Sequence, residues 1–288
     1  MIEKILEFMK KAGKLQMDIR KEKGLCVGYK DHYLMPEVGV NDPVSMVTEA
    51  DLAVSELFRK FVEDNFFGLD YCIIDEENFA KYGDVIFDKI KNTEYLFVID
   101  PLDGTLHYSQ NIPFYGISVG VFKNQEPYIG AIYMPVLEEL VFCNENKQAY
   151  WRKKVFTNEE HEILLQKNYV TTSKLIVDLQ QHFELNNVKN TKGYLFVDYL
   201  CSALSYLLIA TGRVRSGMFK DWLWDMAGAW CIFDALGYRQ YDFTDKKYLT
   251  KLDVADLTQD LKFKNARVVG SQDEVEYLCT VIVRDKHK

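Results

Sequence analysis

The stretch that decides the fold runs from residue 98 to residue 120 and is VIDPLDGTLHYSQNIPFYGISVG. It completes an apolar run, YLFVI at 95–99, which predicts a short buried strand ending at Asp100. Pro101 fixes one backbone dihedral angle and predicts a turn directly after that strand. The turn brings Asp103 back toward the side of Asp100 and leaves the carbonyl group of Leu102 facing the same space. Two carboxylates and one carbonyl oxygen are therefore expected at one end of a strand.

Gly104 and Thr105 extend this arrangement toward a ligand. Glycine lets a backbone approach a ligand closely. Thr105 offers a hydroxyl and an amide at a predicted helix start, where free N–H groups bind phosphate. Asp-Pro and Asp-Gly are also common turn dipeptides, and aspartate is a frequent helix N-cap. From this stretch alone, a metal-and-phosphate site and a purely structural acidic turn both stay open.

The composition indicates a globular chain with an acidic surface. The 288 residues are 48% hydrophobic and 14% aromatic, enough for a sizeable core, and the formal net charge is −8. An acidic chain is not expected to bind nucleic-acid polymers, which need a basic surface. An anionic substrate then needs a local positive element, such as a bound cation or a helix N-terminus.

The other bulk features predict a cytoplasmic protein without a membrane partner. The six cysteines are scattered and form no CxxC pair, so no zinc site is expected. The first residues, MIEKILEFMKKAGKLQ, predict an amphipathic helix and not a signal peptide. The longest mainly apolar stretch, YLCSALSYLLIA at 199–210, is too short and too polar to cross a bilayer.

Hydrophobic periodicity divides the chain into two halves. In the first half we expect a helix over 2–20, a long loop with room for a short hairpin over 21–47, a helix with a capping box from Thr48 to Asp51, strands over 71–74 and 95–99, and an antiparallel meander over 116–143. In the second half we expect a strand over 169–173, a helix near 173–183, a strand over 193–198, helices over 200–211 and 224–236 that end at glycines, and a strand over 266–271. This order predicts an α/β protein with an α+β N-terminal half, 1–150, and an α/β C-terminal half, 151–288.

Acidic side chains recur where the apolar elements begin or end. The set comprises Glu76 and Glu77 after YCII at 71–74, Asp100 and Asp103 after 95–99, Asp225 at a helix start, and Asp51 in the first turn of another helix. In α/β sheets, ligands bind at the ends of strands. Mg²⁺ takes a few carboxylates and fills its other positions with water and substrate phosphate, whereas zinc and copper favour imidazole or thiolate. Each acid alone is also explained as a turn or cap residue, but their joint occurrence predicts a magnesium site.

Four motifs together resemble those of the inositol monophosphatase superfamily. They are TEAD at 48–51, IIDEEN at 73–78, VIDPLDGTLHY at 98–108 and WDMAG at 224–228. The resemblance implies a layered αβαβα sandwich of the inositol monophosphatase and fructose-1,6-bisphosphatase type. It also implies Mg²⁺-dependent hydrolysis of a small-molecule phosphomonoester by a metal-activated water, inhibition by lithium and, since members are often dimers, a homodimer.

Residue roles follow from the resemblance by position. Glu76, Asp100 and the Leu102 carbonyl would hold one Mg²⁺ ion, and Asp100, Asp103 and Asp225 a second. A third, looser ion would lie by Glu76 and Glu77. The catalytic set would be Glu76, Thr105 and Asp51, with Thr105 and Asp51 orienting the attacking water. The amides of Gly104 and Thr105 would bind phosphate oxygens, and Asp103 and Asp225 would also face the substrate.

Substrate choice is expected in the second half, where the chain departs from the family pattern. Members that act on inositol have a glutamate six residues before the tryptophan of W-D, and here Met218 takes that substrate-binding position. LCSA at 200–203 stands where many members have G-[ST]-A-A. Nearby, Arg213, Arg215 and Lys220 form either a solvated basic turn or a pocket for a second anionic group. Next to the motifs, His107 and the pair Trp222 and Trp224 are expected to be packed and not to touch substrate.

The leading hypothesis is a Mg²⁺-dependent phosphomonoesterase. Inositol monophosphate, a sugar bisphosphate such as fructose 1,6-bisphosphate, a 3′(2′),5′-bisphosphate nucleotide and histidinol phosphate all stay open as substrates. The alternative class is a non-catalytic binding or regulatory protein that retains the fold. Such a protein is expected to lose a metal carboxylate or the threonine of D-G-T, and this chain loses neither.

Overall fold

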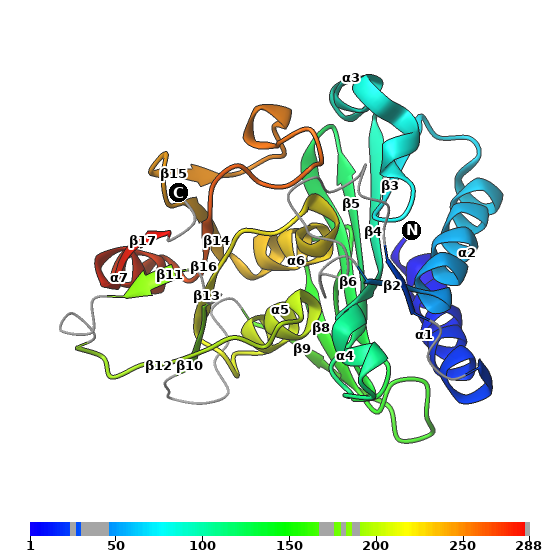
Figure 1. Ribbon diagram of the computed structural model, residues 1–288, viewed down its shortest axis with the longest axis horizontal. Coiled ribbons are helices and arrows are strands. Elements are labelled where there is room, and N and C mark those ends of the chain that lie inside the picture. The colour runs from blue at the N-terminus through cyan, green and yellow to red at the C-terminus, as the bar shows by residue number, and fades with distance from the viewer. Residues whose placement is uncertain (24–26, 30–45, 167–175, 180–182, 186–190, 286–288) are drawn as a thin grey trace.

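Helices and sheets alternate in layers across the molecule (Figure 1). The computed structural model describes residues 1–23, 27–29, 46–166, 176–179, 183–185 and 191–285. The helical layers are α1 (Ile2–Lys23) with α2 (Glu49–Phe66) outside the larger sheet, α5 (Ser202–Ala210) with α6 (Leu223–Leu236) between the sheets, and α7 (Gln272–Val281) outside the smaller sheet. The predicted αβαβα arrangement is confirmed.

The larger sheet is the predicted meander with a parallel pair added at one edge. Within the described residues its strands are, in spatial order, β3 (Tyr71–Asp75), β4 (Tyr95–Asp103), β5 (Gly116–Lys123), β6 (Glu126–Met134), β7 (Glu139–Cys143), β8 (Ala149–Lys153) and β9 (His161–Leu164). β3 pairs with β4 in parallel, and the later neighbours pair antiparallel. Because β3 and β4 are parallel, their carboxyl ends, where the predicted acids lie, share one edge of the sheet.

β4 is buried along its whole length because the sheet is covered on both faces. On one face, α1 and α2 insert aromatic side chains such as Phe8 and Phe58, whose ring centroids are 5.0 Å apart. On the other face, α6 packs against β4, β5 and β6. A strand covered on both sides is expected to be continuously apolar, as YLFVI is.

α6 approaches the larger sheet so closely that three backbone positions in the contact have no room for a side chain. A Cβ atom on Gly120 of β5 would lie 2.4 Å from the carbonyl carbon of Ala227, and one on Gly130 of β6 would lie 2.2 Å from the carbonyl oxygen of Gly228. On the helix side, a Cβ atom on Gly228 would lie 2.8 Å from the Ser118 hydroxyl. This contact sets the first turn of α6, which carries Asp225, against the strand next to β4.

The smaller sheet lies on the far side of α5 and α6. Within the described residues its strands are, in spatial order, β12 (Leu195–Val197), β10 (Ile176–Leu179), β13 (Ser216–Phe219), β16 (Arg267–Gly270), β14 (Arg239–Asp242) and β15 (Lys247–Leu249). β12, β10 and β13 run parallel, so their carboxyl ends share the edge at which α5 begins. The shorter elements are β1 (Val27–Tyr29), β2 (Met46–Thr48), the 3₁₀ helices Phe79–Val85 and Val254–Asp256, α3 (Ile86–Asn92), α4 (Thr105–Ser109), β11 (Phe183–Leu185) and β17 (Ile282–Asp285).

The helix predicted near 173–183 is wrong over its described part. Residues Ile176–Leu179 form β10, which pairs with β12 on one side and β13 on the other. A short apolar run is compatible with both a buried strand and a buried helix. Here the free hydrogen-bonding groups of β12 and β13 on either side determine that it forms a strand. The strand predicted over 169–173 lies outside the described residues.

The other predicted elements of the second half are confirmed. α5 and α6 begin and end within two residues of their predicted limits. Gly212 and Gly237, which follow them, have φ angles of 69° and 71°, in the left-handed region that favours glycine. The predicted strand over 193–198 contains β12, and the strand over 266–271 contains β16.

Of the segment 21–47, the structure describes two short strands. β1 and β2 pair antiparallel, which confirms the hairpin, while residues 30–45 between them lie outside the described part. The division at residue 150 stays a prediction. The larger sheet itself continues past that point, through β8 to β9.

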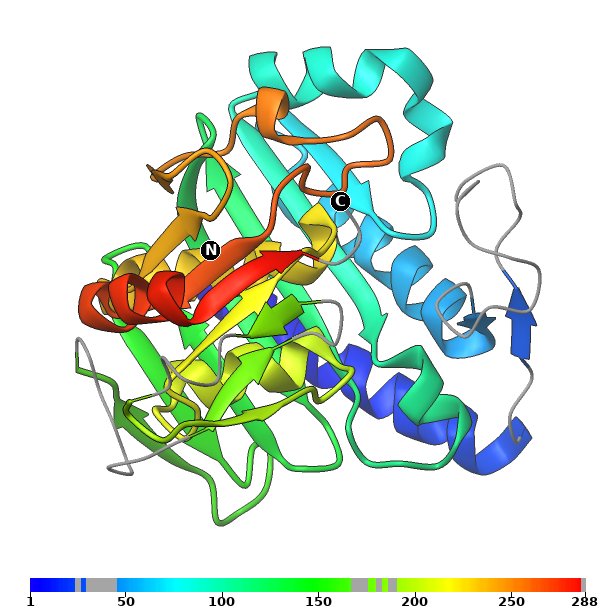
Figure 2. The ribbon, with the colours of Figure 1, turned by 60° about the vertical axis from the view of Figure 1, so that its left-hand side comes forward.

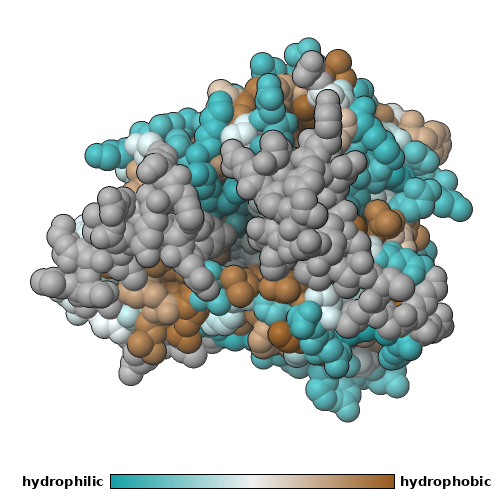
Figure 3. All heavy atoms as spheres, in the orientation of Figure 1, coloured by the Kyte–Doolittle hydropathy of each residue, from teal (hydrophilic) through white to brown (hydrophobic). Residues whose placement is uncertain are grey.

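The described surface is mostly polar, with hydrophobic residues gathered on the lower part of the face in Figure 3. Exposed large hydrophobic side chains among the described residues include Leu195 and Leu200. No helix within the described ranges has the length and apolarity that a membrane crossing requires.

We predict that Gly120→Ala lowers the free energy of unfolding by about 1–3 kcal/mol, the usual cost of overpacking a core. The added methyl group meets the backbone of Ala227, which cannot rotate away. Gly68→Ala is the matched control, because a Cβ atom at Gly68 has no neighbour within 4 Å. Chemical denaturation of both variants measures the difference, and equal stability would contradict the close approach of α6.

Candidate active site

The irregular turn at the C-terminal end of β4 places Asp100 and Asp103 close together in a buried position. The pairing of β4 with β5 becomes irregular between Asp100 and Asp103, as the proline predicted. The Leu102 amide donates to Oδ1 of Asp100 over 3.0 Å, which fixes that carboxylate against its own turn. Asp100 is 2% exposed and Asp103 is 9% exposed.

Gly104 and Thr105 start α4 directly after this turn. Gly104 has a φ angle of 85°, and a Cβ atom there would lie 2.6 Å from the Phe114 carbonyl oxygen, so both backbone and space require glycine. The Thr105 hydroxyl lies 3.0 Å from the Leu102 carbonyl oxygen and 3.3 Å from Oδ1 of Asp51. The structure therefore brings together Thr105 and Asp51, which are far apart in the sequence.

Asp51 serves two neighbours at once. Its Oδ2 accepts a hydrogen bond of 2.7 Å from the Thr48 amide and one of 2.5 Å from the Thr48 hydroxyl, which forms the predicted capping box of α2. Its Oδ1 points to Thr105. The structural role and the proposed site role of Asp51 are compatible because they use different oxygens.

Glu76 and Glu77 follow β3 and are held by a buried neighbour that sequence analysis missed. Asp75 is fully buried, and its Oδ1 accepts from the Glu77 amide over 2.9 Å. Its Oδ2 pairs with Arg59 of α2 at 2.9 Å. Ser55 and Asn78 donate to the same carboxylate. The signal in the sequence was Asp75 itself, an acid inside the apolar strand YCIID.

Asp225 reaches the same region from α6. It occupies position N3 of that helix, and its Oδ2 accepts from the Trp222 amide over 3.0 Å. After burial and the charges of Glu76 and Asp103, the Asp225 carboxyl group is a further cause of the raised pKa of Asp100. Carboxyl groups that raise one another's pKa values favour a shared proton or a cation.

The first turn of α5 binds the other aspartate. Oδ1 of Asp103 accepts from the Ser202 amide over 3.2 Å, and Oδ2 accepts from the Ala203 amide. The LCSA segment thus keeps a helix N-terminus at the site even without the G-[ST]-A-A pattern. Leu200 adopts a φ angle of 52°, a left-handed conformation that glycine adopts at lower cost.

The acids of this cluster repel one another. Burial raises the pKa of Asp100 well above its ordinary value, and the carboxylates of Glu76, Asp103 and Asp225 raise it further. Burial also raises the pKa of Asp103 to about 7, although the α5 amides favour its ionised form. Burial, followed by the charge of Asp221, raises the pKa of Asp225.

The oxygen-rich cluster fits Mg²⁺ in donor chemistry and in charge. Carboxylate and carbonyl oxygens are the ligands that this ion prefers, and a divalent cation offsets the repulsion that raises the pKa values. The ligand geometry is not ready-made. Among the described residues, no three acidic, histidine or cysteine side chains surround a common point as metal ligands.

Comparison with known proteins assigns the chain to a family. The sequence profile of the Inositol monophosphatase family matches residues 3–280. The chain belongs to the inositol monophosphatase family. It is 27% identical over 215 residues to inositol monophosphatase 1 of Saccharomyces cerevisiae, covering 68% of this chain and 69% of that protein.

Solved structures agree with the fold. The extragenic suppressor protein suhB of Bartonella henselae superposes with a TM-score of 0.70 at 18% identity, covering 97% of this chain and 96% of that one. An IMPase/NADP phosphatase complexed with Mg²⁺ and phosphate gives a TM-score of 0.67 at 16% identity, covering 96% and 92%. The predicted phosphatase family and its layered fold are therefore confirmed.

Within this inositol monophosphatase fold, the predicted substrate contact at Met218 is corrected. Its side chain is fully buried in an apolar cluster with Val177, Leu179 and Val268, between the smaller sheet and α7. An unbranched apolar side chain on a central strand packs into the core, so Met218 has no surface to offer a substrate.

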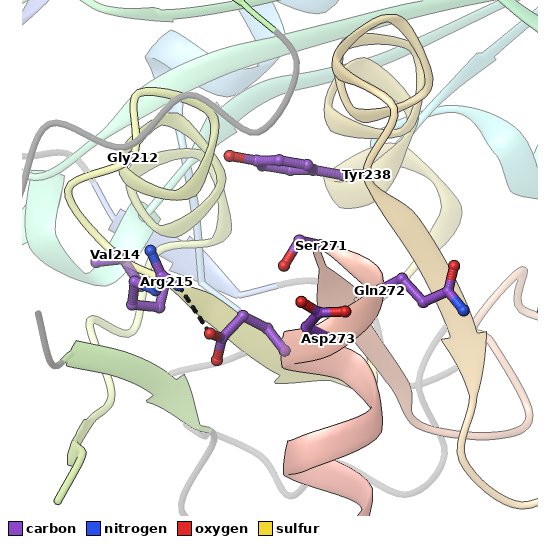
Figure 4. Close-up of a pocket in the computed structure, with 8 residues that line it drawn as sticks. Gly212, Val214, Arg215, Tyr238, Ser271, Gln272 and Asp273 are labelled. Atoms are coloured by element: carbon purple, nitrogen blue, oxygen red, sulfur yellow. Dashed lines mark hydrogen bonds and ion pairs between the residues drawn. The ribbon is translucent and has the colours of Figure 1, made fainter. Parts of the chain in front are cut away.

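Two of the basic residues near Met218, Arg213 and Arg215, are engaged in ion pairs. Arg213 makes two hydrogen bonds to Glu139, the shorter 2.6 Å long. Arg215 pairs with Glu274 at 2.8 Å, beside a pocket that Tyr238 and the start of α7 also line (Figure 4). That pocket lies beyond the C-terminal ends of α5 and α6, away from Asp103 and Asp225 at their N-terminal ends. Neither arginine is therefore placed to meet a second substrate phosphate.

Two further expectations about packed residues are confirmed. His107 is 8% exposed and makes an edge-on contact with Phe114. Trp224 is buried, and Trp222 stacks on it with ring centroids 6.1 Å apart. Lys30, a further residue of segment 21–47, lies outside the described residues.

Sequence analysis also missed Asp221, a buried acid beside the cluster. Its Oδ2 accepts from the Ser202 hydroxyl over 3.2 Å and from the Tyr206 hydroxyl. Since the Ser202 amide binds Asp103, Asp221 is connected to the site through one residue. Its position four residues before Asp225 was the signal available in the sequence.

We predict that added Mg²⁺ raises the melting temperature more at pH 8 than at pH 5. The pKa of Asp103 is raised from its ordinary value to about 7, so the folded state binds more protons than the unfolded chain. The free energy of unfolding therefore falls as the pH rises from about 4 through about 7, and a cation offsets that loss.

Thermal denaturation with and without Mg²⁺, at constant ionic strength, measures this difference. Asp64→Asn on the exposed side of α2 is expected to behave as wild type. An equal Mg²⁺ effect at both pH values would contradict the link between the acidic cluster and cation binding.

Proposed function

We propose that the chain is a Mg²⁺-dependent phosphomonoesterase that hydrolyses a small-molecule monophosphate by attack of an activated water. The observation that carries the proposal is the Thr105 hydroxyl, which lies between Asp51 and the Leu102 carbonyl directly after the turn that holds Asp100 and Asp103. The structural neighbour described as complexed with Mg²⁺ and phosphate supports it.

The residues that would hold the ions are those expected by position. Glu76, Asp100 and the Leu102 carbonyl would bind one ion, Asp100, Asp103 and Asp225 a second, and Glu76 with Glu77 a third. When bound, Mg²⁺ lowers the pKa of a water molecule and offsets the charge of the phosphate.

The chain's own groups would then orient the attacking water and the phosphate. The Thr105 hydroxyl donates to Asp51 or to the Leu102 carbonyl, which leaves a lone pair to accept a hydrogen bond from the attacking water and so orient it. Asp51 is the nearby carboxylate that stabilises this arrangement. The Gly104 and Thr105 amides at the start of α4 offer hydrogen bonds to phosphate oxygens.

The substrate side of the site favours a hydroxyl-bearing alcohol over a second phosphate. Ser202 and Asp221, a hydroxyl and a carboxylate, lie next to Asp103. Arg213 and Arg215 are engaged with glutamates. We therefore propose that a polyol monophosphate, such as inositol monophosphate, is a better substrate than a bisphosphate. Lithium inhibition and a homodimer stay predictions from the resemblance, and a cytoplasmic location stays a prediction from the sequence composition.

We predict that Asp103→Asn keeps the fold and lowers kcat/KM by at least about 100-fold. Losing one metal-held oxygen removes several kcal/mol of transition-state stabilisation, and about 1.4 kcal/mol is tenfold in rate. Phosphate release with and without Mg²⁺ and Li⁺ measures the loss, and circular dichroism checks folding. Wild-type activity in this variant would refute the metal-site assignment, and Asp64→Asn serves as the control.

We predict a higher kcat/KM for a polyol monophosphate than for a sugar bisphosphate. Arg213→Gln and Arg215→Gln are expected to change this ratio by less than about twofold, the usual range of partly exposed substitutions away from a site. A preference for the bisphosphate that Lys220→Met abolishes would instead identify a second anion pocket.

A further inference from the structure

A glutamine is fully buried on α1 where the helix pattern calls for an apolar residue. Gln16 continues the buried stripe of Ile5, Met9 and Ala12 and is 0% exposed. Within the part of the chain that the structure describes, its Oε1 has no hydrogen-bond partner. A buried polar group without a partner costs about 1–3 kcal/mol, so packing alone does not account for this residue.

The amide of Gln16 binds the turn that carries the aspartates. Its Nε2 donates to the Pro101 carbonyl oxygen over 2.7 Å. Pro101 and Leu102 lie where the pairing of β4 with β5 is interrupted, so their carbonyl groups need partners outside the sheet. Leu102 finds one in the Thr105 hydroxyl at 3.0 Å, and Pro101 finds one in Gln16.

The direction of the Pro101 carbonyl group determines the direction of the Leu102 carbonyl group. Successive carbonyls of an extended chain point to opposite sides. A Pro101 carbonyl held toward α1 therefore turns the Leu102 carbonyl toward Thr105, on the side of the acidic cluster. The same constraint fixes the backbone on both sides of the turn, at Asp100 and Asp103.

A second bond ties α4 to the same turn of α1. The Tyr108 hydroxyl donates to the backbone carbonyl of Gln16 over 2.9 Å. Tyr108 is 1% exposed, packs edge-on against Tyr115, and has the Arg20 guanidinium over its ring. Figure 2 shows α4 beside the C-terminal half of α1. One helical turn thus contacts both the aspartate turn and the helix that begins at Thr105.

We propose that Gln16 is a positioning residue for cation binding: its side-chain amide holds the Pro101 carbonyl so that Asp100, Leu102 and Asp103 present their oxygens together. The inference rests on the proposed Mg²⁺ dependence and adds a residue of α1 to it. Gln16 makes no contact with the cation; it acts through the turn.

The test is Gln16→Met, which keeps the shape of the side chain and removes the donor. The variant loses the unsatisfied Oε1 but also leaves the Pro101 carbonyl without its donor, so the melting temperature is expected to change little. The Mg²⁺ concentration for half-maximal thermal stabilisation is expected to rise about 10-fold or more, as for other residues that orient metal ligands. Isothermal titration with Mg²⁺ alone gives a second readout that does not depend on turnover.

Two further variants complete the design. Leu15→Met, a half-buried neighbour on the same helix, is expected to match wild type. Tyr108→Phe removes the bond to α4 but keeps the Gln16 amide, so we expect it to retain more Mg²⁺ affinity than Gln16→Met. If Gln16→Met does not fold, Gln16→Leu takes its place: a weakened Mg²⁺ affinity in that variant supports the proposal, and an unchanged affinity overturns it.

The outcomes separate this inference from the proposed function. A wild-type protein that neither binds Mg²⁺ nor releases phosphate would refute the proposed function itself. A wild-type protein that responds to Mg²⁺, with a Gln16→Met variant that responds equally, would refute only the role of Gln16. A variant with lower melting temperature and unchanged Mg²⁺ affinity would show that Gln16 is structural.

Discussion

The contact between α6 and the larger sheet is the constraint on which the rest of the structure depends. Three glycines let helix and strand backbones meet without side chains between them. A methyl group at Gly120 or Gly130 would move α6 outward and carry Asp225 away from Asp100. The same approach excludes water from the space between the sheet and the central helices, so the acids at its edge are buried. The close approach of α6 to the larger sheet therefore determines both how the site is packed and how deeply its acids are buried.

Burial of these acids lowers the free energy of unfolding, and hydrogen bonds and ion pairs from the surrounding elements reduce that loss. The first turn of α5 donates two amides to Asp103, and Arg59 neutralises Asp75 next to Glu76. Burial, followed by the charges of neighbouring carboxylates, raises the pKa values of Asp100 and Asp225. This distribution fits a site in which part of the charge is left for a cation to balance, at the expense of folding stability in its absence.

Much of the fold and of the candidate site could be predicted because local signals agreed with the tertiary structure. The DPLDGT turn, the capping box at Asp51 and the glycine ends of α5 and α6 depend on short-range chemistry. The helix predicted near 173–183 failed because its apolar run takes its conformation from β12 and β13. The substrate role predicted for Met218 failed because the apolar cluster that buries its side chain comes from other strands and from α7. The sequence left two interpretations of Arg213 and Arg215 open because their partners, Glu139 and Glu274, lie 74 and 59 residues away. Gln16 was missed because the carbonyl group that it binds lies 85 residues away, and Asp221 because its partners belong to another element.

The stacked indoles of Trp222 and Trp224 give the protein a built-in optical reporter. Their rings are 11° from parallel, and Trp224 packs against Phe79 on its other side. The Trp222 amide is bonded to the same Asp225 carboxylate that faces Asp100. Any change in the charge around Asp225 therefore acts on a fixed chromophore pair a few bonds away, and intrinsic fluorescence can follow events at this carboxylate without a label.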